Sequence, residues 1–234
     1  SIPWTPTQNG EIPIRAKVSA SGDPKPSNDI SPSFTVNVQK EGVLGIQIGD
    51  GTETGYIPFS YYNSNSFVQT IYYEDEIKES MGIIDRIVYF NSFKSLAVGA
   101  RPIKIYMSIT DKDGLGAGWD IEEAMLVFDG TYEFPTGEND CIIQLQKVFP
   151  YSGGNLLITT VRPMDRYYGM YDRFFFSKSE DHSERTRFFR DDKAEFNYEQ
   201  EGTTSGDYPN ILLLTNTNVG KVKGIISDED GALD

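Results

Sequence analysis

The sequence predicts an all-β protein, and three observations support that class. Tyrosine and phenylalanine, at 14 residues each, supply more of the apolar content than leucine does, and both favour strands. The 22 glycines and 12 prolines provide the turns that many short strands need. No stretch carries the sustained 3.6-residue apolar period of an amphipathic helix. The 234 residues, 38% of them hydrophobic, can fill a sizeable core.

The first part of the chain, residues 1–40, is expected to contain two strands. Apolar and polar residues alternate over Glu11–Ala20 and again over Phe34–Val38, and a polar loop rich in Pro, Asp and Asn separates the two stretches. Two strands cannot build a hydrophobic core. Residues 1–40 are therefore either part of a separate domain or a segment that packs on the main one.

The central part of the chain, residues 41–215, contains short strand-like runs at intervals of about ten residues, the spacing typical of a sandwich. A single helical turn is expected over Glu74–Ser80. The predicted strands are Gly45–Ile48, Phe67–Tyr73, Gly82–Phe90, Ile103–Thr110, Met125–Thr131, Cys141–Gln146, Leu156–Val161, Phe174–Ser177 and Ile211–Thr215. This number of strands suits two packed sheets with the connectivity of a jelly roll. The prediction is therefore a jelly-roll type β-sandwich with additional β-strand segments at both termini.

The order of several segments resembles a known family. The segments are IGDGTETGYIPFSYYNSNSFVQTIYYEDEI at 48–77, then Ile103–Met107, Trp119, Leu126–Gly130, Phe149–Leu157 and Pro209–Ile211. In this order they are similar to the jelly-roll modules of the cleaved-adhesin family, which occur in gingipains and haemagglutinins of oral and gut bacteria. The resemblance implies a non-catalytic adhesin or ligand-binding module that is secreted or displayed on the cell surface.

The two ends of the chain resemble parts of other β domains. Residues 1–40 are similar to the closing strands of immunoglobulin-like repeats of bacterial surface proteins. Residues 216–234 look like a linker followed by the opening strand of a carboxypeptidase-regulatory-like domain. The positions that match that opening strand are Val222, Gly224, Asp228 and Gly231, whereas Ala232 stands where the family often has proline. Both resemblances imply a multidomain parent chain whose neighbouring domains contact this module.

The charge of the chain bears on its partners. A formal net charge of −14 argues against nucleic acid, because a phosphate backbone is met by clustered Lys and Arg. No apolar stretch reaches the roughly 20 residues that span a bilayer, so we expect no membrane insertion. The expected partners are a host protein or a glycan.

The sequence lacks the common catalytic motifs. His182, the only histidine, lies in a charged loop without a nucleophile and acid arranged around it, and Cys141 lies in an apolar run typical of a buried thiol. No nucleophile elbow or phosphate-binding loop is present. We expect no enzymatic activity. A glycoside hydrolase, which needs only two carboxylates, stays open as an alternative.

Calcium is the one cofactor that the sequence suggests. Asp111 and Asp113 in the loop Asp111–Gly114, together with Asp120, are candidate oxygen ligands for Ca²⁺. The same Asp-x-Asp-Gly pattern is also common in simple turns. Cleaved-adhesin jelly rolls bind calcium, which favours a calcium site here. Their calcium-loop motif is not found in this chain, so no ligand is transferred from the family.

Aromatic side chains are the best candidates for ligand recognition, because sugar rings stack on aromatic faces and tyrosine anchors protein interfaces. The long loop 162–173 is rich in them and is bracketed by arginines. The candidate ligand-binding residues are Arg162, Tyr167, Tyr168, Tyr171 and Arg173, together with Trp119. The loop could equally pack over the edge of the sandwich. The alternatives to an adhesin are a carbohydrate-binding module attached to an enzyme and a structural spacer of a secreted protease.

Overall fold

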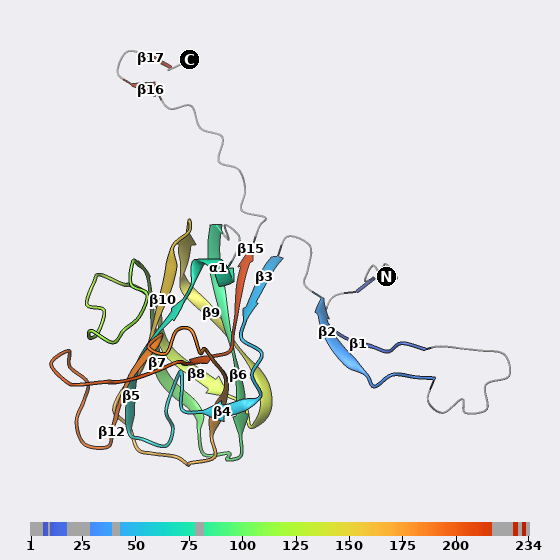
Figure 1. Ribbon diagram of the computed structural model, residues 1–234, viewed down its shortest axis with the longest axis horizontal. Coiled ribbons are helices and arrows are strands. Elements are labelled where there is room, and N and C mark those ends of the chain that lie inside the picture. The colour runs from blue at the N-terminus through green and yellow to red at the C-terminus, as the bar shows by residue number, and fades with distance from the viewer. Residues whose placement is uncertain are drawn as a thin grey trace.

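A computed structural model describes residues 7–8, 10–17, 29–38, 43–77, 82–216, 227–228 and 231–232. The predicted all-β class is confirmed: two antiparallel sheets pack against each other as a β-sandwich (Figure 1). The only helix in the described part is the turn α1, Glu74–Ile77. No helix among these residues is long and apolar enough to cross a membrane.

The first sheet has six strands, in the order β13-β12-β5-β10-β7-β8. Their bounds are β5 Asn65–Tyr72, β7 Gly99–Thr110, β8 Met125–Phe134, β10 Asn155–Arg162, β12 Thr186–Asp191 and β13 Thr203–Ser205. The second sheet has seven, with β14-β11-β6-β15-β3 as its main path, β4 paired to β11 and β9 paired to β6. Their bounds are β3 Val43–Ile48, β4 Glu53–Gly55, β6 Gly82–Phe93, β9 Gly137–Tyr151, β11 Arg173–Lys178, β14 Asp207–Pro209 and β15 Ile211–Asn216.

The strand order has the connectivity of a jelly roll. The second sheet contains the series β3-β15-β6-β9 and the first contains β5-β10-β7-β8, so the chain passes repeatedly from one sheet to the other. Every pairing in both series is antiparallel. The strands β11 to β14, which lie between β10 and β15 in the chain, widen both sheets. The predicted jelly-roll sandwich is therefore observed.

All nine strands that the sequence predicts over the central region are present, and α1 confirms the helical turn after β5. Four further strands were not predicted: β4, β12, β13 and β14. Three of them contain only three residues, which is too short for an alternating pattern. The fourth, β12, has Phe188 and Phe189 next to each other with an arginine on either side, so its apolar and polar residues do not alternate.

The expected terminal strand segments are also present. β1 (Gly10–Ile14) and β2 (Phe34–Val38) pair with each other, and Lys17 bridges Ile30. β16 (Ser227–Asp228) pairs with β17 (Gly231–Ala232) near the other end. Val222 and Gly224, on which the resemblance to a further domain partly depends, lie outside the described residues. The assignment of these ends to neighbouring domains stays a prediction.

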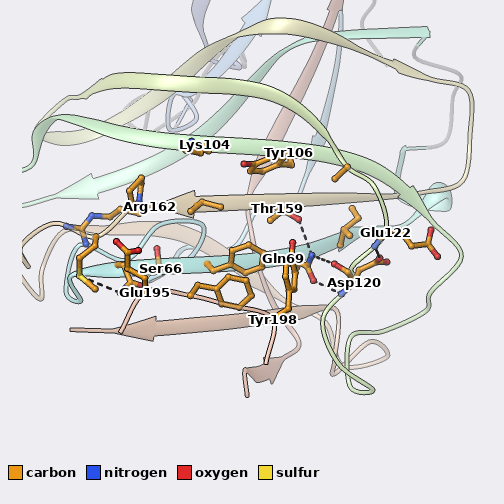
Figure 2. A pocket seen from close by; sticks show the side chains of 18 residues that line it. Ser66, Gln69, Lys104, Tyr106, Asp120, Glu122, Thr159, Arg162, Glu195 and Tyr198 are labelled. Carbon is orange, nitrogen blue, oxygen red and sulfur yellow. Dashed lines mark hydrogen bonds between the residues drawn. The ribbon is translucent and has the colours of Figure 1, made fainter. Parts of the chain in front are cut away.

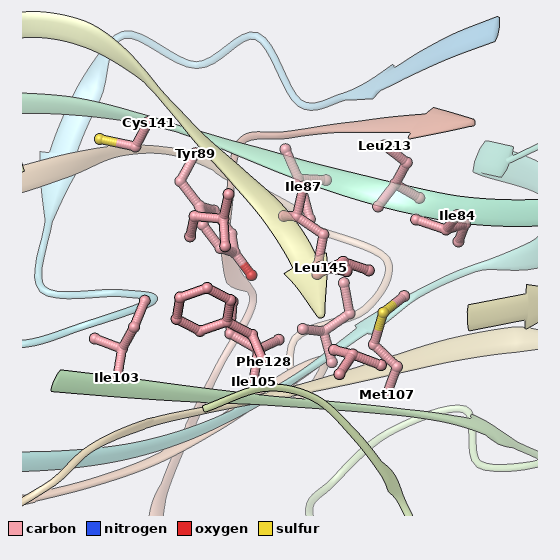
Figure 3. Packing of buried hydrophobic residues seen from close by; sticks show 14 of the residues in the cluster. Ile84, Ile87, Tyr89, Ile103, Ile105, Met107, Phe128, Cys141, Leu145 and Leu213 are labelled. Carbon is pink, nitrogen blue, oxygen red and sulfur yellow. The ribbon is translucent and has the colours of Figure 1, made fainter. Parts of the chain in front are cut away.

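The main core lies between the two sheets and follows from strand alternation. On β7, Ile103, Ile105 and Met107 are fully buried against the second sheet (Figure 3). On β9, Cys141 and Ile143 point inward, whereas Ile142 between them is exposed. Cys141 is free and buried, as the apolar run around it predicts, and burial raises the pKa of its thiol to about 12.

Aromatic rings fill one end of the core. The cluster consists of Phe59, Tyr61, Phe93, Phe134 and Phe174, whose ring centroids lie 5.1–6.4 Å apart, mostly edge to face. Edge-to-face pairs add to the free energy that burial alone supplies. The abundance of Phe and Tyr in the sequence is thus explained in large part by packing.

The alternation on β9 supplies a matched pair of substitutions. Ile143 is fully buried, whereas its neighbour Ile142 is 53% exposed. We expect Ile143→Ala to lower the free energy of unfolding by about 2–5 kcal/mol, because it removes buried methyl groups and leaves a cavity. Ile142→Ala should change it by about 0.5 kcal/mol or less. Urea unfolding of both variants measures the difference, and equal losses would contradict this placement of β9.

The pairing of β1 and β2 predicts that they contribute little to the sandwich. In the described part of the chain these strands pair only with each other. Deletion of residues 1–40 is therefore expected to change the melting temperature by less than about 2–4 °C, the shift that 1 kcal/mol produces in a domain of this size. Calorimetry measures this. A larger loss would mean that residues 1–40 pack as part of the same folding unit.

Candidate functional site

The candidate site lies on the outer face of the six-stranded sheet, the face turned away from the main core. Side chains of adjacent strand residues point to opposite faces. On β5, Tyr72 joins the main core, whereas Phe67 and Gln69 point outward. On β7, Tyr106 points outward, and its neighbours Ile105 and Met107 point into the core. Yet all eight residues of β5 are buried. The outer face of this strand is therefore covered as well.

Two loops cover this outer face and leave a cavity between them. One is 111–124, which joins β7 to β8, and the other is 192–202, which joins β12 to β13. The cavity has a volume of about 440 Å³ and is lined from β5, β7, β10 and both loops (Figure 2). This volume falls within the roughly 300–1,000 Å³ typical of small-ligand sites.

Asp120 anchors the first loop to the sheet. Its backbone N–H donates to Gln69 Oε1 at 2.8 Å, and its carbonyl accepts from Gln69 Nε2 at 2.8 Å. Its carboxylate accepts from the Thr110 hydroxyl at 2.8 Å and forms an ion pair with Lys112 at 3.3 Å. Burial raises the pKa of Asp120, but these partners and the Glu122 amide outweigh burial, so that the pKa lies below its usual value.

Aromatic stacking anchors the second loop. Phe196 stacks on Phe67 with ring centroids 3.7 Å apart, and Trp119 meets both rings edge to face. Trp119 also donates from Nε1 to the Gln200 carbonyl at 2.8 Å. Gly202 permits this contact, because a Cβ there would lie 2.4 Å from an atom of the Trp119 ring. Trp119 therefore joins the two loops behind the cavity.

Four polar side chains of the cavity have no hydrogen-bond partner within the part of the chain that the structure describes: Tyr106, Glu122, Glu195 and Tyr198. Tyr198 is 56% exposed and stands at the mouth. In Figure 2, Glu195 and Glu122 lie toward opposite ends, with the rings of Tyr106 and Tyr198 between them. The cavity thus offers ring faces at its middle and hydrogen-bond acceptors at both ends.

Three of the residues predicted to bind a ligand or metal come together here. Arg162 and Asp120 line the cavity, and Trp119 packs directly behind it. The Arg162 side chain is 1% exposed, and its guanidinium donates to the carbonyls of Ser60, Asn63 and Arg166. Arg162 thereby joins the turn before β5 to the segment that follows β10.

The remaining predicted ligand residues lie farther along the loop 162–173, beyond its first residues 162–164, which line the cavity. Tyr168 donates to the Asp165 carboxylate and packs on the core ring Tyr61. Arg173 donates to the Met170 carbonyl at 2.8 Å. Tyr167 and Tyr171 are 64% and 65% exposed and do not line the cavity. The loop is thus anchored at Tyr168 and Arg173, and it presents Tyr167 and Tyr171, with Arg166 and Met170, to solvent.

The three aspartates predicted to bind calcium are not equivalent. Asp111 and Asp113 are exposed, whereas Asp120 is buried with its oxygens already engaged. Among the residues that the structure describes, no group of three or more His, Cys, Asp or Glu side chains is placed to hold a metal ion. The calcium site stays a prediction.

His182 lies outside the cavity. It is half-buried and stacks on Tyr73, with ring centroids 3.8 Å apart. The sequence predicted a solvated loop position for it, and the structure instead packs its ring against the start of α1.

Sequence reasoning missed the four unpartnered residues of the cavity. The outward position of Tyr106 could have been inferred from the alternation Ile103, Ile105, Met107, which leaves the residues between them on the other face. Glu122, Glu195 and Tyr198 lie on loops. Only the fold brings those loops over the same strands.

Comparisons with known proteins add no family assignment. No protein-family model matches this chain, and no curated protein is matched by it either.

Because the Asp120 carboxylate is hydrogen-bonded and ion-paired, its contribution to the stability of the fold is expected to depend on pH. Because its folded-state pKa is lowered, the ionised group stabilises the fold at pH values above its unfolded pKa of about 3.9, and this contribution is lost as the pH falls through the folded pKa. We expect Asp120→Asn to cost about 1–3 kcal/mol at pH 7 and less at pH 3, where the pH lies below the unfolded pKa.

Urea unfolding at the two pH values measures this difference. Asp111→Asn serves as the control, since Asp111 lies in the same loop but is exposed, and it should cost less than about 0.5 kcal/mol at either pH. A loss in Asp120→Asn that is the same at both pH values would contradict the assigned role of the carboxylate.

Proposed function

We propose that this chain is a non-catalytic ligand-binding module of adhesin type and that it binds a glycan in the cavity on the outer face of the six-stranded sheet. The observation that carries the proposal is the set of unpartnered groups in that cavity. Rings of Tyr106 and Tyr198 lie between the carboxylates of Glu122 and Glu195, on a floor fixed by β5, β7 and β10.

The chemistry of these groups suits a sugar. The C–H faces of a sugar ring pack on aromatic side chains, and sugar hydroxyls donate to carboxylates. The floor is held in place by Gln69, which donates to the Thr159 hydroxyl at 3.3 Å and exchanges two hydrogen bonds with the backbone of Asp120. A rigid floor lowers the entropy cost of binding.

The charges of the cavity favour a neutral glycan over an acidic one. Glu122 and Glu195 are acidic, and Lys104 is paired with Asp129 at 2.8 Å. The guanidinium of Arg162 donates to backbone carbonyls. An anionic sugar would therefore meet carboxylates without a free cation among the described residues of this cavity.

The placement of the two glutamates favours binding of a sugar over its hydrolysis. A glycoside hydrolase places its two carboxylates on either side of one scissile bond. Here the glutamates lie toward opposite ends of the cavity, with aromatic rings between them (Figure 2). The arrangement resembles a recognition surface that holds a sugar chain at several points.

We place the module on a secreted or surface-displayed bacterial protein because its sequence resembles the cleaved-adhesin jelly rolls. The observed jelly-roll connectivity is compatible with that resemblance. A carbohydrate-binding module attached to an enzyme would use the same cavity, and a spacer would use neither the cavity nor the exposed tyrosines.

A glycan-array assay of the whole chain tests the proposal. Tyr198→Ala is expected to weaken binding of the captured glycan at least about tenfold, equivalent to about 1.4 kcal/mol, because it removes the ring at the cavity mouth. Tyr171→Ala is the matched control, since Tyr171 is similarly exposed but lies on the loop 162–173. It should bind as the wild type does.

Three outcomes would count against this proposal. Loss of binding in Tyr171→Ala alone would move the ligand site to the loop 162–173. Hydrolysis of the captured glycan, abolished by Glu122→Gln or Glu195→Gln, would make the module an enzyme. Absence of any glycan binding would leave a protein-binding adhesin or a spacer. A repeat after calcium chelation decides whether the predicted Ca²⁺ is needed.

A further inference from the structure

A second cavity opens at the edge of the sandwich, between the two sheets. It has a volume of about 380 Å³ and is lined by β4 and β11 of the second sheet and by β12 and β13 of the first. Its apolar wall consists of Ile57, Phe176 and Phe188, which together with Val68 form a small core of their own. This cavity is on the inner side of the sheet whose outer side bears the proposed glycan site.

Arg190 projects into this cavity from β12. It shares the inner face of that strand with Phe188, and its guanidinium carbon lies 3.9 Å from the centre of the Phe188 ring and 5.7 Å from that of Tyr56. The side chain is mostly buried, and its Nε is buried without a hydrogen-bond partner. Among the described residues, no carbonyl or carboxylate accepts a hydrogen bond from Arg190 and none forms an ion pair with it.

The other buried arginines of the chain show how unusual this is. Arg185 forms two hydrogen bonds with the Glu76 carboxylate, at 2.9 and 2.7 Å, and two with the Ile71 carbonyl. Arg162 donates to three backbone carbonyls. The Arg162 Nε is buried without a partner, as the Arg190 Nε is, but the Nη atoms of Arg162 and Arg185 are matched by acceptors, whereas no guanidinium nitrogen of Arg190 has an acceptor among the described residues.

The Arg190 guanidinium is only partly removed from water. Its Nε is buried without a partner, whereas its Nη atoms are open to solvent and to a ligand. Acceptors from a bound ligand would compensate the part of its hydration that burial removes. Burial lowers the pKa of Arg190 to about 10, so the group is still protonated at neutral pH. The chain has 35 acidic residues, and none of those described is placed against it.

We propose that Arg190 is the centre of an anion site that binds a carboxylate carried on an apolar or aromatic group. The planar guanidinium matches a carboxylate with two parallel hydrogen bonds. Hydroxyl donors from Thr204 and Ser205 line the same cavity, and the rings of Phe176 and Phe188 with Ile57 would receive the apolar part. The ligand class follows from this pairing of one cation with an apolar wall.

The one carboxylate that lines the cavity, Asp207, does not neutralise Arg190. It forms no ion pair with Arg190, and it also contributes to the raised pKa of Lys178, which is due mainly to the hydrogen bond to Glu53. Lys178 and Glu53 are paired at 2.8 Å. The positive charge of Arg190 therefore stays available to a ligand.

The site is independent of the glycan cavity, because the two open on opposite faces of the same sheet. Failure of either proposal leaves the other intact. Residues of the Arg190 cavity can also be changed without touching those of the glycan cavity, since no residue lines both.

Titration of the whole chain with benzoate, followed by the NMR resonance of the Arg190 Nε–H group, tests the proposal. We expect a saturable shift with benzoate and none with benzamide, which has the same shape but no charge. Arg190→Gln should weaken benzoate binding at least tenfold, as followed by backbone amides of β12 and β13. Arg166→Gln is the control, since Arg166 is exposed, lies over Tyr168 and does not line the cavity.

A second variant keeps the test decisive if Arg190→Gln does not fold. Thr203 lines the same cavity from the edge strand β13 and is exposed, so Thr203→Trp should fill the mouth, leave the melting temperature nearly unchanged and abolish the benzoate response. Equal responses to benzoate and benzamide, unchanged binding in the variants, or a response to sulfate but not to benzoate would each overturn the proposal.

Discussion

The structure depends on one strand, β5, that is buried on both of its faces. Its inner face joins the cores between the sheets, and its outer face is sealed by the loops 111–124 and 192–202. The backbone of Asp120 and the side chain of Gln69 exchange two hydrogen bonds that fix the first loop, and the stacking of Phe196 on Phe67 fixes the second. Because both anchors are residues of β5, the same strand holds the sandwich together and shapes the cavity.

The arginines of this protein differ in role: some hold chain segments together, and one is a candidate binding group. In an acidic chain each buried guanidinium needs acceptors, and Arg162 and Arg185 satisfy this with carbonyls and with Glu76. They stabilise the chain segments around β5 and α1. Arg190 lies at the edge of the sandwich, where solvent and ligands can enter, and none of its guanidinium nitrogens has an acceptor among the described residues. A partly buried guanidinium without any acceptor calls for a specific explanation.

The fold was predictable from local patterns, whereas the site was only partly so. Alternation such as that of Ile103, Ile105 and Met107 identifies a strand and its buried face without knowledge of its neighbours. Trp119, Asp120 and Arg162 were predicted and do gather at the cavity, although Asp120 and Arg162 are engaged in holding its walls. The loop 162–173 has the composition of a binding loop, but much of that composition serves to pack it onto the core ring Tyr61.

The sequence by itself determined the β class, the nine strands of the central region and the alternation that buries Cys141 and Ile143, because these depend on residues adjacent in the chain. Only the tertiary structure decided which loops meet. Glu122 and Glu195 lie 73 positions apart in the sequence, and the jelly-roll connectivity brings their loops over the same three strands. It also placed Arg190 opposite Tyr56, which directly follows β4, and Phe176 of β11 in the other sheet. Contacts of this kind arise from the pairing and packing of distant strands, and no local pattern encodes them.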